Sequence, residues 1–210
     1  MITAKESLKH YRQVLTSGGP VYLEGPVTAG ELEHLSINEE LKNFRSPRRQ
    51  KEALIIAARS PEGLVYIARH QQEIVGYVMF HAPSPYTRWS KHPRLLELGA
   101  IEVSRRWQRQ GIARALLQVA FSNRTLEEYV IITTEFYWHW DLKGSGLDVW
   151  SYQRMLNRLF GTVGFKKRRT DDPEILEHPA NMLMVRFGKN LSSTYIKAFE
   201  ELTYQNTLTE

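Results

Sequence analysis

The chain contains no cysteine among its 210 residues. Disulfides, thiolate metal sites and a cysteine acyl-enzyme are therefore excluded. None of the seven histidines forms a His-x-x-x-His pair, and no Gly-x-Ser-x-Gly elbow occurs. The usual zinc site and the serine hydrolase site are unsupported, so we expect no metal. If the protein moves an acyl group, the transfer is direct or uses a nucleophile other than cysteine.

Long apolar runs are also missing. The longest helical candidate is the short stretch at residues 53–58, and the first thirty residues lack the apolar segment of a secretory signal. We therefore expect a cytoplasmic protein with no membrane partner. We find no internal repeat and no low-complexity tract.

Charge and length set further limits. With 28 Lys and Arg against 23 Asp and Glu, the formal charge is +5. This balance favours an anionic ligand or an acidic partner, falls short of a nucleic-acid footprint, and is equally compatible with a charge that serves only solubility. A chain of this length suits one catalytic domain, which we place over residues 1–210.

The most informative segment is a strand that leads through a polar turn into a helix. Mostly apolar residues occupy 95–103, a turn follows at 108–113, and one helical face is marked by Ile112, Ala115, Leu116 and Val119. Because Gly111 and Ala113 carry little or no side chain, successive backbone N–H groups can converge on an anion that the helix dipole also favours. The segment predicts a pyrophosphate cradle.

Two familiar phosphate loops do not match this turn. The Walker loop ends in Gly-Lys-Ser/Thr, and the dinucleotide fingerprint needs three glycines. The remaining pattern, Gln108-x-x-Gly111-x-Ala113, resembles the acyl-CoA loop of the Gcn5-related N-acetyltransferase (GNAT) superfamily, with an ordinary polar turn as the alternative. The resemblance implies acetyl-CoA as co-substrate, held by Ile101, Val103, Gln108, Arg109, Gln110, Gly111, Ile112, Ala113 and Arg114.

Periodicity and turn residues predict alternating strands and helices along the chain. Predicted strands lie at 21–24, 64–69, 74–81, 95–103 and 129–134, with a final pair at 163–167 and 181–187. Predicted helices lie at 29–35, 47–59, from 112, from 148 to about 160, and after Ser192 or Ser193. The Pro-rich stretch 82–94 is predicted to be a loop.

This order of elements is that of the GNAT fold. We therefore predict an α/β (α+β) protein with a mixed central sheet flanked by helices. Within the single domain we assign an N-terminal strand and helix region to 20–60, the acyl-CoA-binding core to 64–170, and a C-terminal strand and helix to 180–203.

A closer resemblance extends over nearly the whole chain. The segments that carry it are 23–27, Phe44-Arg45-x-Pro47, 74–77, 97–103, the aromatic block 133–144 and 178–181. Together they resemble the acetoin utilisation acetyltransferase family of bacilli. The resemblance implies a protein lysine acetyltransferase that inactivates acetyl-CoA synthetase in acetate and acetoin metabolism, and names that synthetase as the partner.

The resemblance also assigns a role to the strand at 95–103. In the superfamily this strand splays from the next one, and the pantetheine arm pairs with its edge as an added strand. Backbone groups around Ile101 and Val103 would hold the arm, and a main-chain N–H would stabilise the developing oxyanion.

Two carboxylates on that strand are candidates for the general base, which must take a proton from a lysine ammonium. Glu97 occupies the position used by histone-type members, and Glu102 lies nearest the cradle. An odd separation places them on opposite faces of a regular strand, and both remain candidates.

The general acid is less well marked. Phe160 occupies the place where many family members have tyrosine, so the thiolate leaves with help from water, Tyr137 or Tyr152. Tyr152 lies on an apolar helical stripe and is better explained by the core. His139 and Asp141 could form a proton relay, although we favour a structural or docking role.

Two basic segments are candidates for binding surfaces. The first, Arg88, Trp89, Lys91 and Arg94, suits an acidic protein partner or is scattered surface charge. The second, at residues 166–169, could hold the CoA 3′-phosphate, contact the partner or be simply solvated. Two further functions stay open: acetylation of a small amine, and a non-catalytic acyl-CoA sensor that regulates a protein partner.

Overall fold

The computed structural model describes residues 9–205, which fall into two compact units. The first comprises residues 9–81 and 98–125, and the second comprises 82–97 and 126–205. Strand β6, Leu95–Val103, begins in the second unit and ends in the first. The single domain expected over residues 1–210 stays a prediction.

The first unit is built on a largely antiparallel sheet. Its strands run in the order β1-β2-β4-β5-β6, and the short β3 pairs in parallel with β5. The elements are β1 His10–Thr16, β2 Gly19–Gly25, α1 Ala29–His34, β3 Ser36–Ile37, α2 Pro47–Arg59, β4 Leu64–His70, β5 Glu73–His81 and α3 Ile112–Phe121. The hairpin β4–β5 and helices α1, α2 and α3 are confirmed, whereas β1 and β3 were not predicted.

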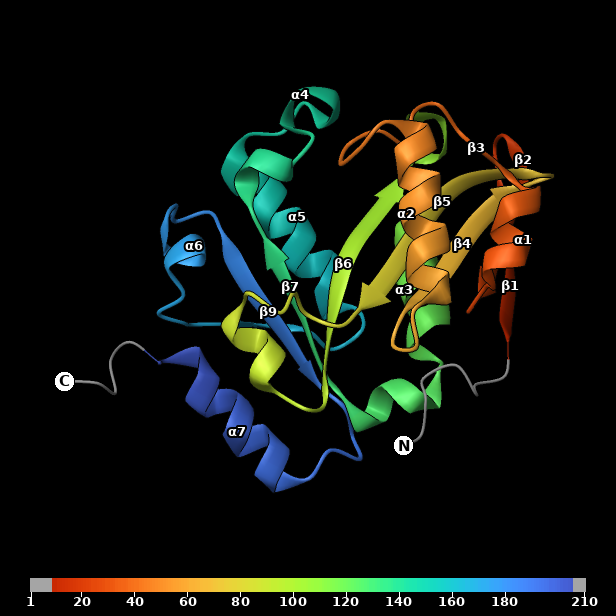
Figure 1. Ribbon diagram of the computed structural model, residues 1–210. Coiled ribbons are helices and arrows are strands. Elements are labelled where there is room, and N and C mark those ends of the chain that lie inside the picture. The colour runs from red at the N-terminus through yellow and green to blue at the C-terminus, as the bar shows by residue number, and fades with distance from the viewer. Residues whose placement is uncertain (1–8, 206–210) are drawn as a thin grey trace. The chain divides into compact units, whose positions relative to one another are not determined.

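Helices cover both faces of this sheet (Figure 1). Because successive strand residues point to opposite sides, Val65 and Ile67 pack toward α1 and α2 together with Leu54. Tyr66 points the other way, where its ring meets Phe80 edge to face at 6.2 Å, and Phe80 in turn meets Phe121 of α3 at 5.7 Å. The two apolar layers hold β5 and the end of β6 in place.

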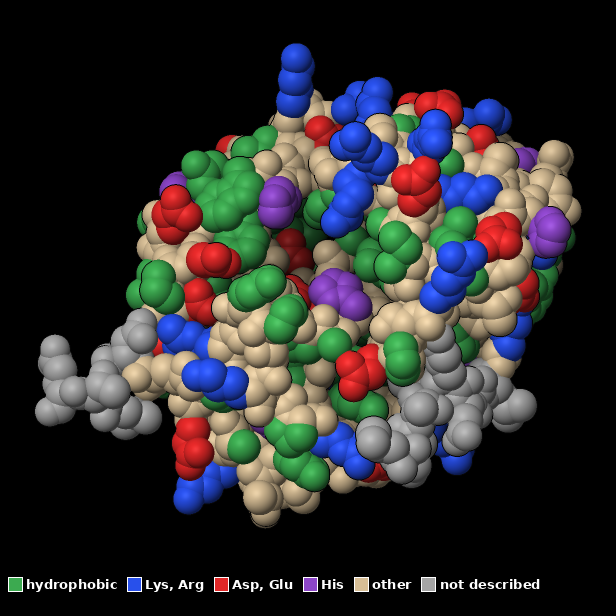
Figure 2. All heavy atoms as spheres, in the orientation of Figure 1, with side chains coloured by type: hydrophobic (Ala, Val, Ile, Leu, Met, Phe, Trp, Pro, Cys, Tyr) green, Lys and Arg blue, Asp and Glu red, His purple; other side chains and the backbone are tan. Residues whose placement is uncertain are grey.

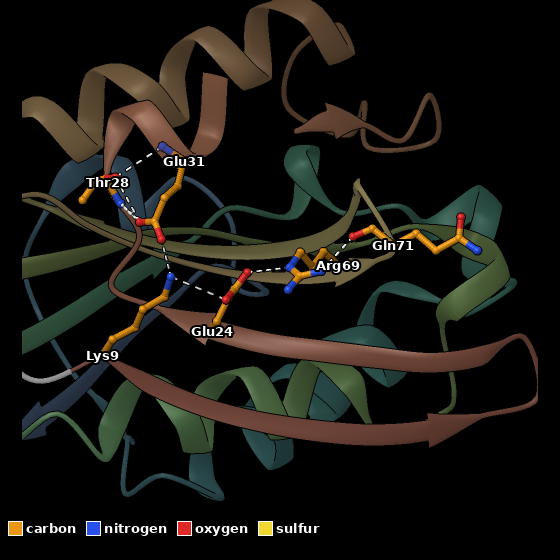
Figure 3. Close-up of polar contacts among 6 residues, drawn as sticks. All are labelled: Lys9, Glu24, Thr28, Glu31, Arg69 and Gln71. Atoms are coloured by element: carbon orange, nitrogen blue, oxygen red, sulfur yellow. Dashed lines mark hydrogen bonds and ion pairs between the residues drawn. The ribbon is translucent and has the colours of Figure 1, made fainter. Parts of the chain in front are cut away.

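A network of charged and polar side chains joins β2, β4 and the start of α1 (Figure 3). Glu24 of β2 accepts from the Arg69 guanidinium of β4 at 2.6 Å and lies 3.5 Å from the Lys9 ammonium. Lys9 also pairs with Glu31, which forms a capping box with Thr28 at the start of α1. The capping box satisfies two N–H groups at the start of the helix, so α1 begins where Thr28 lies.

The second unit carries a mixed sheet in the order β6-β7-β9-β8. Leu95–Glu97 of β6 runs parallel to Val130–Ile132 of β7, and the other pairs are antiparallel. The elements are β7 Val130–Glu135, α4 Leu142–Ser145, α5 Val149–Gly161, β8 Lys166–Arg168, α6 Pro173–Leu176, β9 Met182–Phe187 and α7 Ser193–Thr203.

The core of this unit lies between its sheet and α7. Val130, Ile132 and Leu183 pack with Trp89 and with Phe199 of α7. The final strand pair is confirmed with a correction, because β8 begins at Lys166 and not at residue 163. Residues 162–164 instead form the turn after α5, in which Gly164 has φ +92°. Within residues 9–205, no helix is both long enough and apolar enough to span a membrane.

Candidate functional site

The turn between β6 and α3 is fixed to the first unit by buried side chains and by backbone bonds. Ser104 donates its N–H to the Val75 carbonyl at 2.9 Å, which ties the end of β6 to β5. The next residues form a single 3-10 turn, Arg105–Trp107, whose Trp107 is buried against the His70 ring at 4.9 Å. The start of the turn, up to Trp107, is therefore held firmly against the first unit.

Gly111 makes the sharp turn into α3. Its φ is +80°, in the left-handed region that favours glycine, and a Cβ built at this position would meet nothing within 4 Å. The helix begins here, since Ala115 donates to the Gly111 carbonyl at 3.0 Å. The N–H groups of Ile112, Ala113 and Arg114 precede this first bond and have no acceptor within the helix.

Two glutamine side chains brace the turn from inside. Gln108 donates from Nε2 to the Val103 carbonyl at 2.9 Å, and Gln110 donates to the Arg106 carbonyl at 3.0 Å. Gln110 also accepts from the Ser17 N–H at 2.8 Å. The turn therefore offers its main chain, and not these amides, to a ligand.

The cradle fits a pyrophosphate by shape and by charge. Main-chain N–H groups, an open position at Gly111 and the positive end of α3 converge, and the first turn of the helix carries no acidic residue. Arg109 and Arg114 belong to the same stretch. Ile112 contributes only its backbone, since its side chain is buried. The residues present thus suit the diphosphate of an acyl-CoA.

Glu102 is held in place by two donors of the first unit. Its Oε1 accepts from the Asn43 N–H at 2.9 Å, and its Oε2 accepts from the Tyr77 hydroxyl at 2.8 Å. Burial first, and the negative charge of Glu102 second, raise the pKa of Tyr77, so this tyrosine remains a donor. Glu102 therefore joins β6 to β5 and to the loop before α2.

Glu97 belongs to the second unit. It accepts from the Thr134 hydroxyl at 3.2 Å and lies opposite Ile132 in the register of β6 and β7. Burial, with a further contribution from the charge of Glu97, raises the pKa of Glu135 at the end of β7. Glu97 thus shares its surroundings with a second carboxyl group.

The candidates for the general acid also lie in the second unit. Tyr137 donates its N–H to Asn181 Oδ1 at 3.0 Å, and its ring lies 4.1 Å from that of His178. Tyr152 stacks on Trp140 at 5.3 Å, and Phe160 is fully buried. Of the three predicted catalytic residues, Glu102 therefore lies in one unit and Glu97 and Tyr137 in the other.

In the aromatic block at residues 133–144, Asp141 has a structural role. Asp141 caps α4 by accepting from the Gly144 N–H at 2.8 Å. The His139 ring lies about 6 Å from the rings of Phe136 and Trp138. These contacts agree with a structural or docking role for the pair.

The docking surface predicted at residues 88–94 is wrong for two of its members. Trp89 is only 3% exposed and stacks on Phe199 of α7 at 5.6 Å. Arg88 pairs with Asp171 and lies 3.7 Å from Asp172. Their partners are distant in sequence, so a pattern of aromatic and basic residues could not distinguish this buried anchor from an exposed one. Lys91 remains exposed.

The second basic segment is exposed. Residues 166–169 lie along and just beyond the terminal strand β8, and Arg168 forms an ion pair with Glu200 at 3.4 Å. Binding of the CoA 3′-phosphate or of the protein partner by this segment stays a prediction. In the part of the chain that the structure describes, no group of three or more His, Asp or Glu is placed to hold a metal ion.

Sequence reasoning missed Asn43 and Tyr77 as the partners of Glu102. Tyr77 carries a weak signal, because it is a polar-tipped residue in an apolar strand and needs a partner when buried. Asn43 contributes its backbone N–H, which no sequence pattern marks.

Comparisons with known proteins agree with this geometry. A model of the "Acetyltransferase (GNAT) family" matches residues 32–134. The acetoin utilization protein AcuA of Bacillus licheniformis is 44% identical, covering 94% of this chain and 95% of that protein. AcuA of Bacillus subtilis is 42% identical, with coverage of 93% and 94%.

Solved structures give the same result. The acetoin utilization protein of Exiguobacterium sibiricum aligns with a TM-score of 0.95 at 44% identity, covering 97% of this chain and 98% of that one. The GNAT domain of S. lividans PAT, at 15% identity and a TM-score of 0.51, covers 84% of this chain and 96% of its own, and it shares the fold. Acetyl-CoA is the co-substrate that this fold uses. The chain therefore belongs to the AcuA family of acetoin utilisation proteins and is an N-acetyltransferase with the GNAT fold.

Proposed function

We propose that this protein transfers the acetyl group of acetyl-CoA to a lysine of acetyl-CoA synthetase and thereby inactivates it, in the cytoplasm. The observation that carries the proposal is the main-chain cradle at Gly111 in a chain related over nearly its whole length to acetoin utilisation proteins. The family resemblance supplies the acceptor. Modification of a lysine that the synthetase needs for its own chemistry would switch that enzyme off.

In this proposal the diphosphate of acetyl-CoA binds the N–H groups around Gly111, Ile112 and Ala113. The pantetheine arm lies along residues 98–103 of β6, the last strand in the order of the first unit. Backbone groups of Ile101 and Val103 would bond it as an added strand does. A main-chain N–H there would stabilise the oxyanion as the amine attacks the thioester carbonyl.

The acceptor lysine must lose a proton before it attacks, since its unperturbed pKa is about 10.4. We propose Glu97 as the base and Glu102 as a positioning residue. Both oxygens of Glu102 already accept hydrogen bonds that hold the Asn43 loop and Tyr77. Glu97 accepts from the Thr134 hydroxyl at 3.2 Å, which is long for an O–H···O hydrogen bond, so this contact is weaker than either bond to Glu102.

The departing CoA thiolate must be neutralised or solvated. A thiol with a pKa of about 8.5 is a tolerable leaving group, so water can serve. Tyr137 is the candidate acid from the protein, since the tyrosine typical of the family is replaced by the buried Phe160. Tyr137→Phe would then lower the rate most at low concentrations of general-acid buffers.

The test is an acetyl-transfer assay with two acceptors, acetyl-CoA synthetase and a polyamine, and a control without acceptor. Mass spectrometry of the synthetase should find acetate on one lysine, together with loss of synthetase activity. Turnover with the polyamine alone would replace the proposal by small-amine acetylation. Binding of CoA without any transfer would instead indicate a sensor.

A further inference from the structure

Four rings of the second unit form a continuous surface, which we call the aromatic array: Tyr137, Trp138, Trp150 and His178. Tyr137 meets Trp138 edge to face at 5.4 Å and lies against His178 at 4.1 Å. Trp150, at the start of α5, stacks on His178 at 6.4 Å with an interplanar angle of 23°. Residues from three separate segments thus build one surface.

Both tryptophans of the array are exposed to solvent, although large aromatic side chains are usually buried. Trp138 is 46% and Trp150 45% exposed. Figure 2 shows hydrophobic side chains gathered at the upper left, over the beginning of α5, with acidic and histidine side chains beside them. Exposed apolar surface of this kind marks sites of interaction.

The charge around the array is opposite in sign to that of the whole chain. Residues 136–154 and 173–181, which carry the array, contain four carboxylates and two cations, against a formal charge of +5 overall. The carboxylates are Asp141, Asp148, Glu174 and Glu177, and the cations are Lys143 and Arg154. An excess of carboxylates in the segments that carry the tryptophans suits a cationic partner.

Two of these carboxylates are held in fixed positions. Asp148 caps α5 by accepting from the N–H groups of Trp150 and Ser151 at 2.9 and 3.0 Å, and hydrogen bonds from Ser151 lower its pKa. Asp141 caps α4. The positions of these two charges are therefore fixed by the helix starts in the segments that carry the array.

A basic wall bounds the array on one side. His178 also lines a pocket of about 430 Å³, and the same pocket is lined by Lys167, Arg168 and Arg169. A cationic ligand is repelled there. A cationic ligand is therefore expected at the exposed tryptophans and not in this pocket.

We propose that the aromatic array docks a positively charged segment of the protein acceptor, with lysine or arginine side chains against the exposed parts of the Trp138 and Trp150 rings. This inference rests on the proposed function, in which the acceptor presents a lysine. The array supplies cation–π contacts to the charged group and apolar contacts to its methylene stem. Its two tryptophans would set the KM for the acceptor, whereas Tyr137, the candidate acid, would act in the chemical step.

The experiment compares the wild type with a Trp138→Ala/Trp150→Ala double variant. Tyr86→Ala is the matched control, because Tyr86 is 96% exposed and lies outside the array. Two measurements are made: acetylation of acetyl-CoA synthetase, and fluorescence anisotropy of labelled lysine peptides flanked by either arginine or glutamate. Affinity for acetyl-CoA and thermal unfolding report whether the variants remain folded.

We expect the double variant to raise the KM for the synthetase, and the Kd for the arginine-flanked peptide, by about tenfold, with kcat and acetyl-CoA affinity unchanged. Glu177→Lys should shift the peptide preference toward glutamate, and Trp138→Phe should retain part of the affinity. Should the double variant prove unfolded, Glu177→Lys and Trp138→Phe decide the question by themselves.

The inference and the proposed function fail in different ways. Binding of the arginine-flanked peptide without acetylation would support the array and reject the acetylation of lysine. Acetylation with an unchanged KM in the double variant would reject the array. A change of oligomeric state in that variant, with the acceptor KM unaltered, would assign the surface to a contact between copies and also reject it.

Discussion

Replacement of Gly111 by alanine separates the strain of a left-handed residue from the loss of a phosphate contact. Gly111 has φ +80°, and its added methyl would meet no protein atom within 4 Å. The stability cost is therefore backbone strain alone, about 1–2 kcal/mol for an L-residue in this region. The methyl does project beside the N–H groups that we assign to the diphosphate.

A diphosphate displaced by that methyl loses at least one charge-assisted hydrogen bond, worth about 1.5–3 kcal/mol. Because about 1.4 kcal/mol is tenfold in affinity, the Kd for acetyl-CoA should rise by about 10- to 100-fold. Isothermal titration with CoA measures the affinity, and urea unfolding measures the stability.

Gly146 offers a matched control. It also has a left-handed φ, +69°, with nothing within 4 Å of an added Cβ, but it ends α4 in the second unit. Gly146→Ala should cost the same stability and leave CoA affinity unchanged. Equal CoA affinity in Gly111→Ala and the wild type would refute the assignment of the cradle.

Three further predictions address the base, the partly buried Arg186–Glu127 ion pair and the corrected docking surface. Glu97→Gln should lower kcat by about 10²- to 10⁴-fold near pH 7, with partial recovery at high pH, where the lysine amine is already deprotonated. Glu102→Gln should lower kcat by a smaller factor. The reverse order in a pH–rate profile would exchange the roles of the two residues. Burial acts to raise the pKa of Glu127, but bonds from the Lys189 N–H and from Arg186 outweigh it and lower the pKa, so its contribution to stability is present above the unfolded carboxyl pKa and is lost as the pH falls. Glu127→Gln should thus cost about 1–3 kcal/mol in urea unfolding at pH 7 and less in acid; a cost independent of pH would contradict this. Arg88→Met should destabilise the fold by about 3 kcal/mol because it leaves two largely buried carboxylates unneutralised, with acceptor KM unchanged; a changed KM with intact stability would restore the docking role.

The sequence was most informative where one face of an element is buried. Strands β4 and β5 are apolar along most of their length, and α2 begins at Pro47 as its sequence indicates. Strand β1 escaped detection because two of its apolar residues face solvent, with Tyr11 57% and Leu15 80% exposed. Its place is fixed by pairing with β2, which periodicity does not report.

In the candidate site, too, the sequence revealed some features and not others. Gly111 was identifiable because a local backbone requirement, a left-handed turn before a helix, leaves a mark in the sequence. The partners of Glu102 were not, since the Asn43 N–H and the Tyr77 hydroxyl come from segments 59 and 25 residues away. Trp89 was misjudged for the same reason, because Phe199 covers it from the far end of the chain.

The most direct measurement is the mass of acetyl-CoA synthetase after incubation with acetyl-CoA and either the wild type or Gly111→Ala. The account predicts one acetylated lysine and an inactive synthetase with the wild type, and a much slower reaction with Gly111→Ala that recovers at high acetyl-CoA concentration. A synthetase that stays unmodified and active while small amines are acetylated would contradict it.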